Sequence, residues 1–371
     1  MEREHMPRAQ RIVVKVGSSS LTSVENSLDE LAIATISDVL AKLKRSNPHV
    51  ELVFVSSGAI AAGLAPLGLK RRPKDLATQQ AAASVGQSLL MTRYTDIFAR
   101  YGVTVSQVLL TVEDLIAQDR YTNVHRQLER LLDLGVMPIV NENDAVATAE
   151  LKFGDNDRIA ALVAHTVKAD ALVLLSDVDA LYDKHPDEGG VRVHTVSSPD
   201  ALEGLSIGAA GSAVGSGGMA TKVMAASLAA ASGIPALVTS ASKAREALAG
   251  QDVGTWFYAT GTRRSTRMLW LEHLADARGA IMLDAGAVAA VKRRNSLLAA
   301  GITGVEGAFE ATEPVNLIDM QGTVIARGLA AYDAASMRSM VGLHSREIID
   351  QLGDEFDGTV VHADNIALVT S

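Results

Sequence analysis

Several polar segments that follow apolar runs carry residue types that could do chemistry. In the first segment, Lys15 lies inside the apolar run 13–16 and is followed by Gly17 and three serines. A lysine within a buried strand is costly unless it is paired. One interpretation is an edge strand with Lys15 pointing to water. The other is a phosphate loop, in which Gly17 lets backbone N–H groups approach a phosphate while Lys15 supplies charge.

The second segment, residues 56–63, reads Ser-Ser-Gly-Ala-Ile-Ala-Ala-Gly and directly follows another apolar run. It leads into a helix of small residues, so hydroxyls and N–H groups gather at a helix start. Such a position suits an anion. Serine also caps helices that bind no ligand, and this segment alone does not decide between the two.

Acidic and amide side chains follow two further runs. The sequences Asn-Glu-Asn-Asp (141–144) and Gly-Asp-Asn-Asp (154–157) come in succession after the apolar run 136–140. One such cluster would be ordinary turn chemistry. Two of them, where an α/β sheet binds ligands, indicate a site for an amine or for Mg²⁺-phosphate. Ser176 and Asp177 end another run, where a capped turn is the simpler interpretation.

A glycine-rich stretch precedes a second lysine, because residues 215–222 read Gly-Ser-Gly-Gly-Met-Ala-Thr-Lys. It is not a Walker P-loop, since Thr221 precedes Lys222 where that motif needs lysine first. Nor is it a dinucleotide fingerprint, since Ala220 occupies the third glycine position. Two separated lysines, glycine-rich turns and acidic loops suit phosphoryl transfer by charge neutralisation.

Other chemistries are excluded or disfavoured by composition. The chain has no cysteine, which excludes disulfides, zinc–thiolate sites, iron–sulfur clusters and thiol nucleophiles, and favours a reducing cytoplasm. No G-x-S-x-G elbow surrounds Ser57, and the nine histidines have no metal-binding spacing. The polar start predicts no secretory signal, and no window is apolar enough to span a membrane. A net charge of -9 opposes general attraction to nucleic acid or anionic membranes.

Short β-branched runs alternate with longer helical patterns through the first two-thirds of the chain. The expected strands are 11–16, 50–55, 103–109, 136–140, 171–175 and 236–239. The expected helices are 28–45, 75–101, 112–134, 156–168 and 219–232. This alternation predicts an α/β fold with an open, mostly parallel sheet sandwiched by helices. Such sheets bind ligands at the carboxyl ends of their strands, where the polar segments lie.

A length of 371 residues, 48% of them hydrophobic, predicts two or three domains. The pattern changes after residue 261, where alternating runs separated by glycine-containing turns replace the β-α-β alternation. We therefore expect a first domain at 1–262, a linker at 263–277 and a smaller β-rich domain at 278–371. That last domain carries seven basic and twelve acidic residues, a net charge of -5.

Taken together, VVKVGSS, SSGAIAAG, NENDAVA, GDND and SGGMATK resemble the amino acid kinase superfamily and, within it, the glutamate 5-kinase family, in order and spacing. The stretch IMLDAGAVAAVKRRNSLLAAGI resembles the start of a PUA domain, so the resemblance covers nearly the whole chain. It implies the amino acid kinase fold followed by a PUA-like domain. It also implies ATP- and Mg²⁺-dependent phosphorylation of the glutamate side-chain carboxylate to L-glutamyl 5-phosphate, the first step of proline biosynthesis.

The resemblance also implies roles for individual residues. Lys15 and Lys222 would be catalytic, stabilising charge on the transferring phosphoryl group, and Asp157 would orient both lysines. The residues that would hold glutamate are Ser57, Asp144 and Asn156, with Asp144 a sensible partner for the substrate ammonium. The residues that would line the ATP site are Lys15, Gly17, Ser176, Asp177, Ser216, Gly217, Gly218, Met219, Ala220, Thr221 and Lys222. Metal ligands are not indicated.

The sequence also indicates partners for this protein and leaves two alternative functions open. The resemblance implies a homo-oligomer, proline as a feedback inhibitor and a glutamyl phosphate reductase as a partner. The composition indicates a cytoplasmic protein without a membrane partner and disfavours nucleic acid as a partner. One alternative is a kinase for aspartate, N-acetylglutamate or carbamate, against which the paired acidic loops and the PUA-like domain argue. The other is an RNA-binding protein that uses the PUA-like domain. It needs a basic face, whereas the domain's net charge has the wrong sign and its basic residues concentrate at 292–294.

Overall fold

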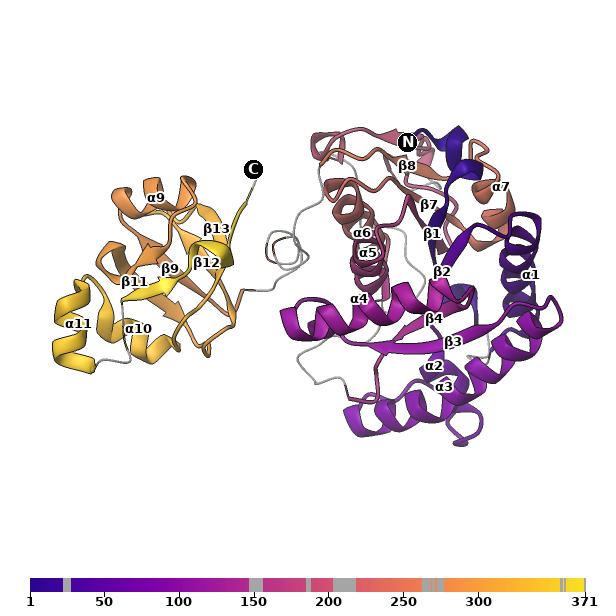
Figure 1. Cartoon of the computed structure of the whole chain (residues 1–371), viewed down its shortest axis with the longest axis horizontal. Helices are drawn as coiled ribbons and strands as arrows, with labels where there is room; N and C mark the ends of the chain where they lie inside the picture. Colours follow the sequence, from indigo (N-terminus) through magenta and orange to yellow (C-terminus); the bar gives the residue numbers. More distant parts are fainter. Residues whose placement is uncertain are drawn as a thin grey trace. The chain divides into compact units, whose positions relative to one another are not determined.

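The chain forms two compact units, Met1–Arg263 and Arg264–Ser371, in a computed structural model (Figure 1). The structure describes all residues except 23–27, 147–155, 185–187, 203–217, 262–267, 269–270, 272–276, 354–355, 357 and 370–371. Each unit has a sheet and a hydrophobic core of its own. The two units are therefore described separately.

An eight-stranded sheet with the order β3-β4-β2-β1-β5-β7-β8-β6 forms the centre of the N-terminal unit. The strands are β1 (Arg11–Val16), β2 (Glu51–Ser56), β3 (Val105–Leu110), β4 (Met137–Glu142), β5 (Ala171–Ser176), β6 (Thr195–Val196), β7 (Ala236–Ser240) and β8 (Thr255–Phe257). Strands β3, β4, β2, β1, β5 and β7 are all parallel, and only the β7–β8 pairing is antiparallel. The carboxyl ends of the six parallel strands therefore meet at one edge of the sheet.

The expected α/β class and the open, mostly parallel sheet are confirmed. Each of the six expected strands is present within two residues of its expected bounds. The short strands β6 and β8 were not expected, because two or three residues are too few to show a periodicity. The edge-strand interpretation of the run containing Lys15 is wrong: β1 pairs with β2 on one side and with β5 on the other.

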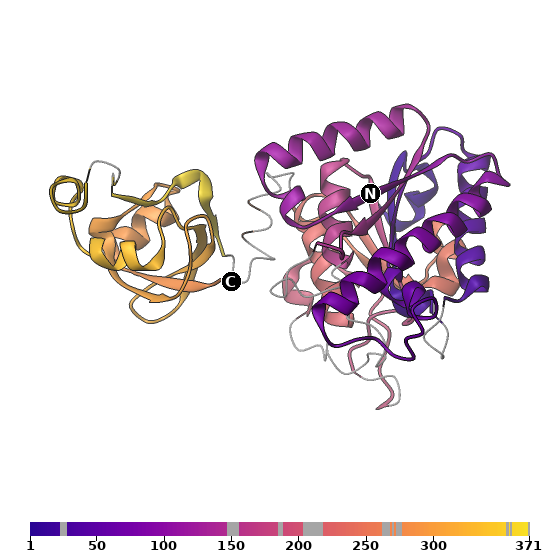
Figure 2. The same ribbon diagram turned by 90° about the horizontal axis from the view of Figure 1, so that it is seen from below.

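Helices cover both faces of this sheet (Figures 1 and 2). The helices are α1 (Glu30–Ser46), α2 (Ala59–Leu64), α3 (Leu76–Ala99), α4 (Gln118–Asp133), α5 (Asn156–Thr166), α6 (Met219–Ala231) and α7 (Ala244–Leu248). Asp29 and Asp75 begin α1 and α3 by accepting hydrogen bonds from backbone N–H groups of the first turn, at 3.0 and 2.9 Å. The helix expected at 112–134 begins only at Gln118, since Thr111 and Asp114 bond each other in a preceding turn.

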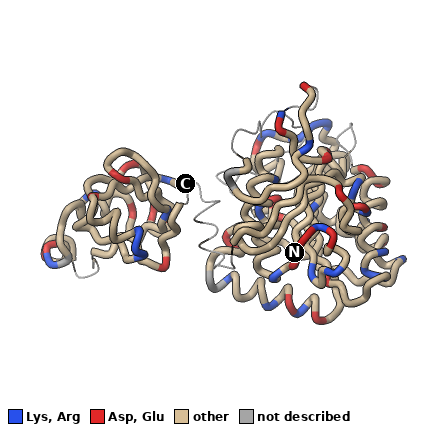
Figure 3. The backbone as a smooth tube through the Cα atoms, turned by 90° about the horizontal axis from the view of Figure 1, so that it is seen from above, with Lys and Arg blue, Asp and Glu red and all other residues tan. Residues whose placement is uncertain are grey.

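Alternation along β1 divides its side chains between the two helical layers. Val14 and Val16 belong to the core that also contains residues of α1, α3 and α7. Because successive side chains of a strand point to opposite faces, Lys15 points to the face that α5 and α6 cover. Most charged residues of this unit lie on helices and loops (Figure 3), and the charged residues of its strands other than Lys15 lie at strand ends: Arg11, Glu51 and Glu142. Lys15 is therefore unusual in lying within the sheet.

Helices α2 and α3 cross at two glycines. A Cβ atom at Gly86 would lie 1.8 Å from the carbonyl oxygen of Ala59, and one at Gly63 would lie 1.9 Å from that of Ala82. Neither position could carry a side chain without a shift of backbone. Since α2 begins three residues after β2 ends, this crossing fixes α3 close to the carboxyl edge of the sheet.

The C-terminal unit is β-rich, as expected. It has a five-stranded sheet of order β11-β9-β12-β13-β15 and a separate pair, β10 and β14. Its elements are β9 (Gly279–Leu283), α9 (Ala285–Lys292), β10 (Leu297–Leu298), β11 (Ile302–Gly307), β12 (Pro314–Ile318), β13 (Val324–Leu329), α10 (Ala334–Met340), α11 (Ser345–Leu352), β14 (Thr359–Val361) and β15 (Ile366–Leu368). Leu271, within the expected linker, is fully buried in a cluster with Leu329 and Ala367 of this unit.

Candidate active site

Two buried lysines share one buried carboxylate at the carboxyl edge of the sheet. Nζ of Lys15 lies 2.6 Å from Oδ1 of Asp157, and Nζ of Lys222 lies 3.4 Å from Oδ2. The three residues come from β1, from the first turn of α5 and from the first turn of α6. All three are at most 4% exposed. The structure thus brings together the three residues that the sequence indicated as catalytic.

Asp157 is ionised, and its charge is what allows two lysines to be buried. Burial alone disfavours the carboxylate, but the charges of Lys15 and Lys222, with hydrogen bonds from Lys15 and Thr221, outweigh burial and lower its pKa to about 2. Thr221 contributes through its hydroxyl, which lies 2.8 Å from Oδ2. Two ammonium groups against one carboxylate leave a net positive charge in a water-poor site. This arrangement suits an anion that gains negative charge during a reaction.

Asn156, the neighbour of Asp157, faces a different set of groups. Its Nδ2 donates to Oδ1 of Asn141 at 3.0 Å, and its Oδ1 accepts from the backbone N–H of Glu142 at 3.0 Å. Asn141 and Glu142 are the last two residues of β4. The first turn of α5 therefore joins two clusters, with Asp157 bound to the lysines and Asn156 bound to the end of β4.

Asp144 lies two residues beyond Glu142 and is 7% exposed. Its Oδ1 has no hydrogen-bond partner among the residues the structure describes. Burial raises its pKa to about 6, although the positive charge of Arg72 lowers it in part. A buried carboxylate oxygen that lacks a donor suits a cationic group of a ligand, such as an ammonium.

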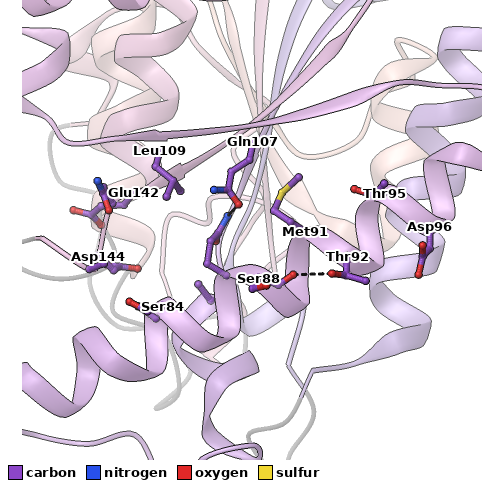
Figure 4. A pocket seen from close by; sticks show the side chains of 15 residues that line it. Ser84, Ser88, Met91, Thr92, Thr95, Asp96, Gln107, Leu109, Glu142 and Asp144 are labelled. Carbon is purple, nitrogen blue, oxygen red and sulfur yellow. Dashed lines mark hydrogen bonds between the residues drawn. The ribbon is translucent and has the colours of Figure 1, made fainter.

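A pocket of about 610 Å³ opens beside Asp144 (Figure 4). Glu142 and Asp144 lie on one side of it and Asp96 lies at its other end, with Gln107 pointing in between. Helix α3 provides most of the remaining lining. The lining residues from α3 are Ala83, Ser84, Gln87, Ser88, Met91, Thr92, Thr95 and Asp96. The pocket is thus polar, with carboxylates at both ends.

Ser57 and Gly58 follow β2 at the same edge of the sheet. Ser57 is buried, and Gly58 has a φ of 102°, a conformation that glycine adopts without strain. The preceding Ser56 bonds Tyr94 of α3, with 2.8 Å between the two hydroxyl oxygens. This bond fastens the end of β2 to α3 next to Ser57.

The expected nucleotide residues are only partly described. The N–H of Gly17 donates to the carbonyl oxygen of Leu175 at 3.1 Å, so this group is already used within the sheet. Ser176 ends β5 and its Oγ donates to Asp177 at 2.9 Å. Met219, Ala220, Thr221 and Lys222 form the first turn of α6, and Gly218 precedes it. Ser216 and Gly217 lie outside the described residues.

Sequence reasoning missed Gln87, Tyr94 and Gln107. Gln87 is buried on the face of α3 that also buries Ala82, Ala83 and Leu90. A polar residue at a buried position of a helix was the available signal, because such a residue needs a partner. Among the described residues, no group of three or more His, Asp or Glu side chains could hold a metal ion.

The comparisons with known proteins agree with this geometry. Residues 10–240 match the amino acid kinase family, and residues 279–352 match the PUA domain. The chain is therefore an amino acid kinase with a C-terminal PUA domain, as the motifs indicated. In the part of the chain that the structure describes, no helix has both the length and the apolar character needed to cross a membrane.

Curated relatives narrow the class. Glutamate 5-kinase of Streptomyces avermitilis is 55% identical over 99% of this chain and 98% of its own length. The glutamate 5-kinase of Frankia casuarinae is 53% identical over 99% of this chain and 99% of its own length. That of Thermobifida fusca is 50% identical over 99% of this chain and 95% of its own length. The chain belongs to the glutamate 5-kinase family.

Proposed function

We propose that this chain transfers the γ-phosphoryl group of ATP to the side-chain carboxylate of L-glutamate, forming L-glutamyl 5-phosphate and ADP in the first step of proline biosynthesis. One observation carries the proposal. A charge-coupled Lys15–Asp157–Lys222 cluster lies at the ligand-binding edge of the sheet in a chain that matches glutamate 5-kinases over its whole length.

The reaction needs no nucleophile from the protein. An oxygen of the glutamate carboxylate attacks the γ-phosphorus, the bond to the bridging oxygen breaks, and that oxygen leaves with ADP. Lys15 and Lys222 stabilise the charge on the transferring group, and Asp157 holds both ammonium groups in place. Catalysis then rests on in-line positioning and electrostatic stabilisation.

Glutamate is held by Ser57, Asp144 and Asn156 in this proposal. The unpartnered oxygen of Asp144 accepts from the substrate ammonium, and Asn156 donates from Nδ2 to a substrate oxygen. Ser57 contributes its hydroxyl at the end of β2. The polar pocket beside Asp144 supports an amino acid rather than an apolar substrate.

ATP is placed over the ends of β1 and β5 and at the start of α6. The proposed ATP residues are Lys15, Gly17, Ser176, Asp177, Ser216, Gly217, Gly218, Met219, Ala220, Thr221 and Lys222. Because the described residues provide no three-ligand metal cluster, Mg²⁺ fits best as a partner of the nucleotide phosphates, where it neutralises charge. Gly17 would act by leaving space rather than by donating its N–H, which Leu175 already accepts.

The remaining assignments follow from family membership. We propose a kinase domain at 1–262 and a PUA domain at 278–371, with Leu271 packed on the latter. We further propose a cytoplasmic homo-oligomer, inhibited by proline at the glutamate site, whose product passes to a glutamyl phosphate reductase.

The test is ADP formation from Mg²⁺-ATP with glutamate, aspartate, N-acetylglutamate or carbamate as acceptor, with hydroxylamine present to trap acyl phosphate. Turnover and hydroxamate with glutamate support the proposal. Turnover with only another acceptor would keep the kinase chemistry and change the substrate. No turnover with any acceptor by the folded chain would refute the proposal.

A further inference from the structure

A chain of side-chain amides runs from the proposed glutamate site to the pocket along α3. Nδ2 of Asn156 donates to Oδ1 of Asn141 (3.0 Å), and Nδ2 of Asn141 donates to Oε1 of Gln87 (2.7 Å). Nε2 of Gln87 then donates to Oε1 of Gln107 (3.2 Å). The first three side chains are buried and Gln107 is exposed. This chain of hydrogen-bonded amides therefore begins in the protein interior and ends in solvent.

The direction of this chain is set by a backbone group. An amide side chain can be turned over so that its nitrogen and oxygen exchange places, but a backbone N–H can only donate. The N–H of Glu142 points at Oδ1 of Asn141 (2.9 Å) and at Oδ1 of Asn156 (3.0 Å). Both asparagines must therefore present oxygen to Glu142, and the nitrogen of Asn141 must face Gln87. Gln87 in turn must offer its oxygen.

Without the Gln87 oxygen this arrangement is not stable. The Nδ2 group of Asn141, which is 1% exposed, would be buried without its acceptor. A buried amide without a partner is destabilising, and turning Asn141 over would break its bonds to both Glu142 and Asn156. In the first case Asn141 would lose the bond that fixes its nitrogen, and in the second Asn156 would lose the oxygen that holds its Nδ2. Of the two hydrogens on that atom, one is used by Asn141 and the other is the donor assigned to glutamate.

The backbone of Gln87 is also held firmly. Its neighbour Gly86 touches the backbone of Ala59 so closely that a Cβ there would lie 1.8 Å from the Ala59 carbonyl oxygen. Ala59 begins α2, directly after Ser57 and Gly58. One turn of α3 therefore packs on the start of α2 and, through Gln87, accepts a hydrogen bond from Asn141, the partner of Asn156.

We infer that Gln87 is a positioning residue for phosphoryl transfer, which holds Asn156 through Asn141 so that an N–H of Asn156 faces glutamate. The inference rests on the proposed role of Asn156 in binding glutamate. It requires no contact between Gln87 and the substrate. The inference concerns binding of glutamate and not of ATP, because the hydrogen-bonded amides lead from Asn156 away from Asp157 and the two lysines.

The test compares Gln87→Met, Gln87→Glu and the control Gln127→Met in the full chain, with Asn156→Ala as the reference for loss of the contact. Methionine fills the space of Gln87 without an acceptor, so the KM for glutamate should rise about tenfold while the KM for ATP stays within about twofold. Glutamate at position 87 accepts from Asn141, and also from Gln107 once that amide turns over, so the KM should return to within about threefold of wild type. Gln127→Met makes the same substitution at an exposed position of α4 outside the lining of the pocket, so it should change the KM for glutamate less than about twofold.

The outcomes separate the inference from its alternatives. An unchanged glutamate KM in Gln87→Met would overturn it, as would equal rises for glutamate and ATP, which indicate general loosening. A Gln87→Glu variant no better than Gln87→Met would show that Gln87 only fills space. If Gln87→Met does not fold, Gln87→Asn, which has a shorter side-chain amide, replaces it. A KM for glutamate in Gln87→Asn equal to that of the wild type would then overturn the inference. Absence of glutamate-dependent turnover in the wild type would instead refute the proposed function.

Discussion

The ammonium of Lys15 lies 2.6 Å from Oδ1 of Asp157, and this ion pair joins the central strand of the sheet to the first turn of α5. Both side chains are almost completely buried. A buried pair is not chiefly a source of stability, because desolvation of two charges offsets most of their attraction. The pair instead fixes the geometry of the site, because it holds a positive charge at one place, where the proposed phosphoryl transfer would occur.

Removing Lys222 should abolish most catalysis without unfolding the protein. In Lys222→Ala, Asp157 keeps its partner Lys15, so no buried charge is left alone. The loss of a positioned charge should lower kcat by roughly 10²–10³-fold. Steady-state kinetics measures the loss of kcat, and a thermal unfolding curve checks that the variant is folded.

Lys243→Ala is the matched control, because that lysine is half-exposed and pairs only with Glu246 at 3.6 Å among the ion pairs of the described residues. Its kcat should stay at the wild-type value. Near-normal turnover in folded Lys222→Ala would remove Lys222 from the mechanism.

Glutamate use should depend on pH through Asp144, whose pKa is about 6 because of burial. The substrate ammonium needs the ionised carboxylate, so kcat/KM for glutamate should fall about tenfold per pH unit below 6 and reach a plateau above it. The variant Asp144→Asn should have a low kcat/KM with no such step. If the wild-type kcat/KM for glutamate, divided by the kcat/KM for ATP, stayed constant between pH 5 and 7, the assignment of Asp144 to the substrate ammonium would be contradicted.

The same shift affects stability, and its sign is opposite to that of most carboxylates. The pKa of Asp144 is raised in the folded state from an ordinary value of 3.8, so the folded chain binds more protons between pH 4 and 6. Its contribution to the free energy of unfolding therefore falls by about 3 kcal/mol as pH rises through that window. Denaturant unfolding of wild type against Asp144→Asn measures the difference, and Asp133→Asn, an exposed site, is the control.

How far the sequence predicted this structure is clear from individual residues. The apolar runs located the parallel strands because all of these strands except β3 are buried on both faces. The same pattern hid the position of Lys15, because a central strand and an edge strand look alike in sequence when a single lysine interrupts them. The family motifs brought Lys15, Asp157 and Lys222 together correctly. A polar residue on the buried face of a helix marked Gln87 as needing a partner, but its partners on β3 and β4 depend on the spatial order of β3, β4 and α3, which no local pattern records.

Adding one methyl group at the crossing of α2 and α3 should disturb the glutamate site. In Gly86→Ala the new Cβ would lie 1.8 Å from the carbonyl oxygen of Ala59, a backbone atom that cannot turn aside. The variant should lose about 1–3 kcal/mol of stability and, because α2 moves, should have a raised KM for glutamate. Ala81→Leu, a larger addition on the exposed side of the same helix, should change stability by less than about 0.5 kcal/mol. Equal effects of the two substitutions would show that the crossing is not tight.

Cutting the chain between the two units should leave a working kinase, but the place of the cut matters. Lys15, Asp157 and Lys222 all lie in the unit Met1–Arg263, which has its own core. A fragment of residues 1–263 should therefore keep glutamate-dependent turnover within about tenfold of the full chain.

A fragment of residues 1–277 differs from it only by a segment whose Leu271 is fully buried against Leu329 and Ala367 of the other unit. Without those partners Leu271 becomes an exposed apolar side chain, so the longer fragment should be the less soluble of the two while turning over glutamate at the same rate. Light scattering at matched concentrations and a turnover assay compare them. Loss of turnover in a folded 1–263 fragment would show that the catalytic unit needs the PUA domain, and equal solubility would show that the segment around Leu271 does not need its partners.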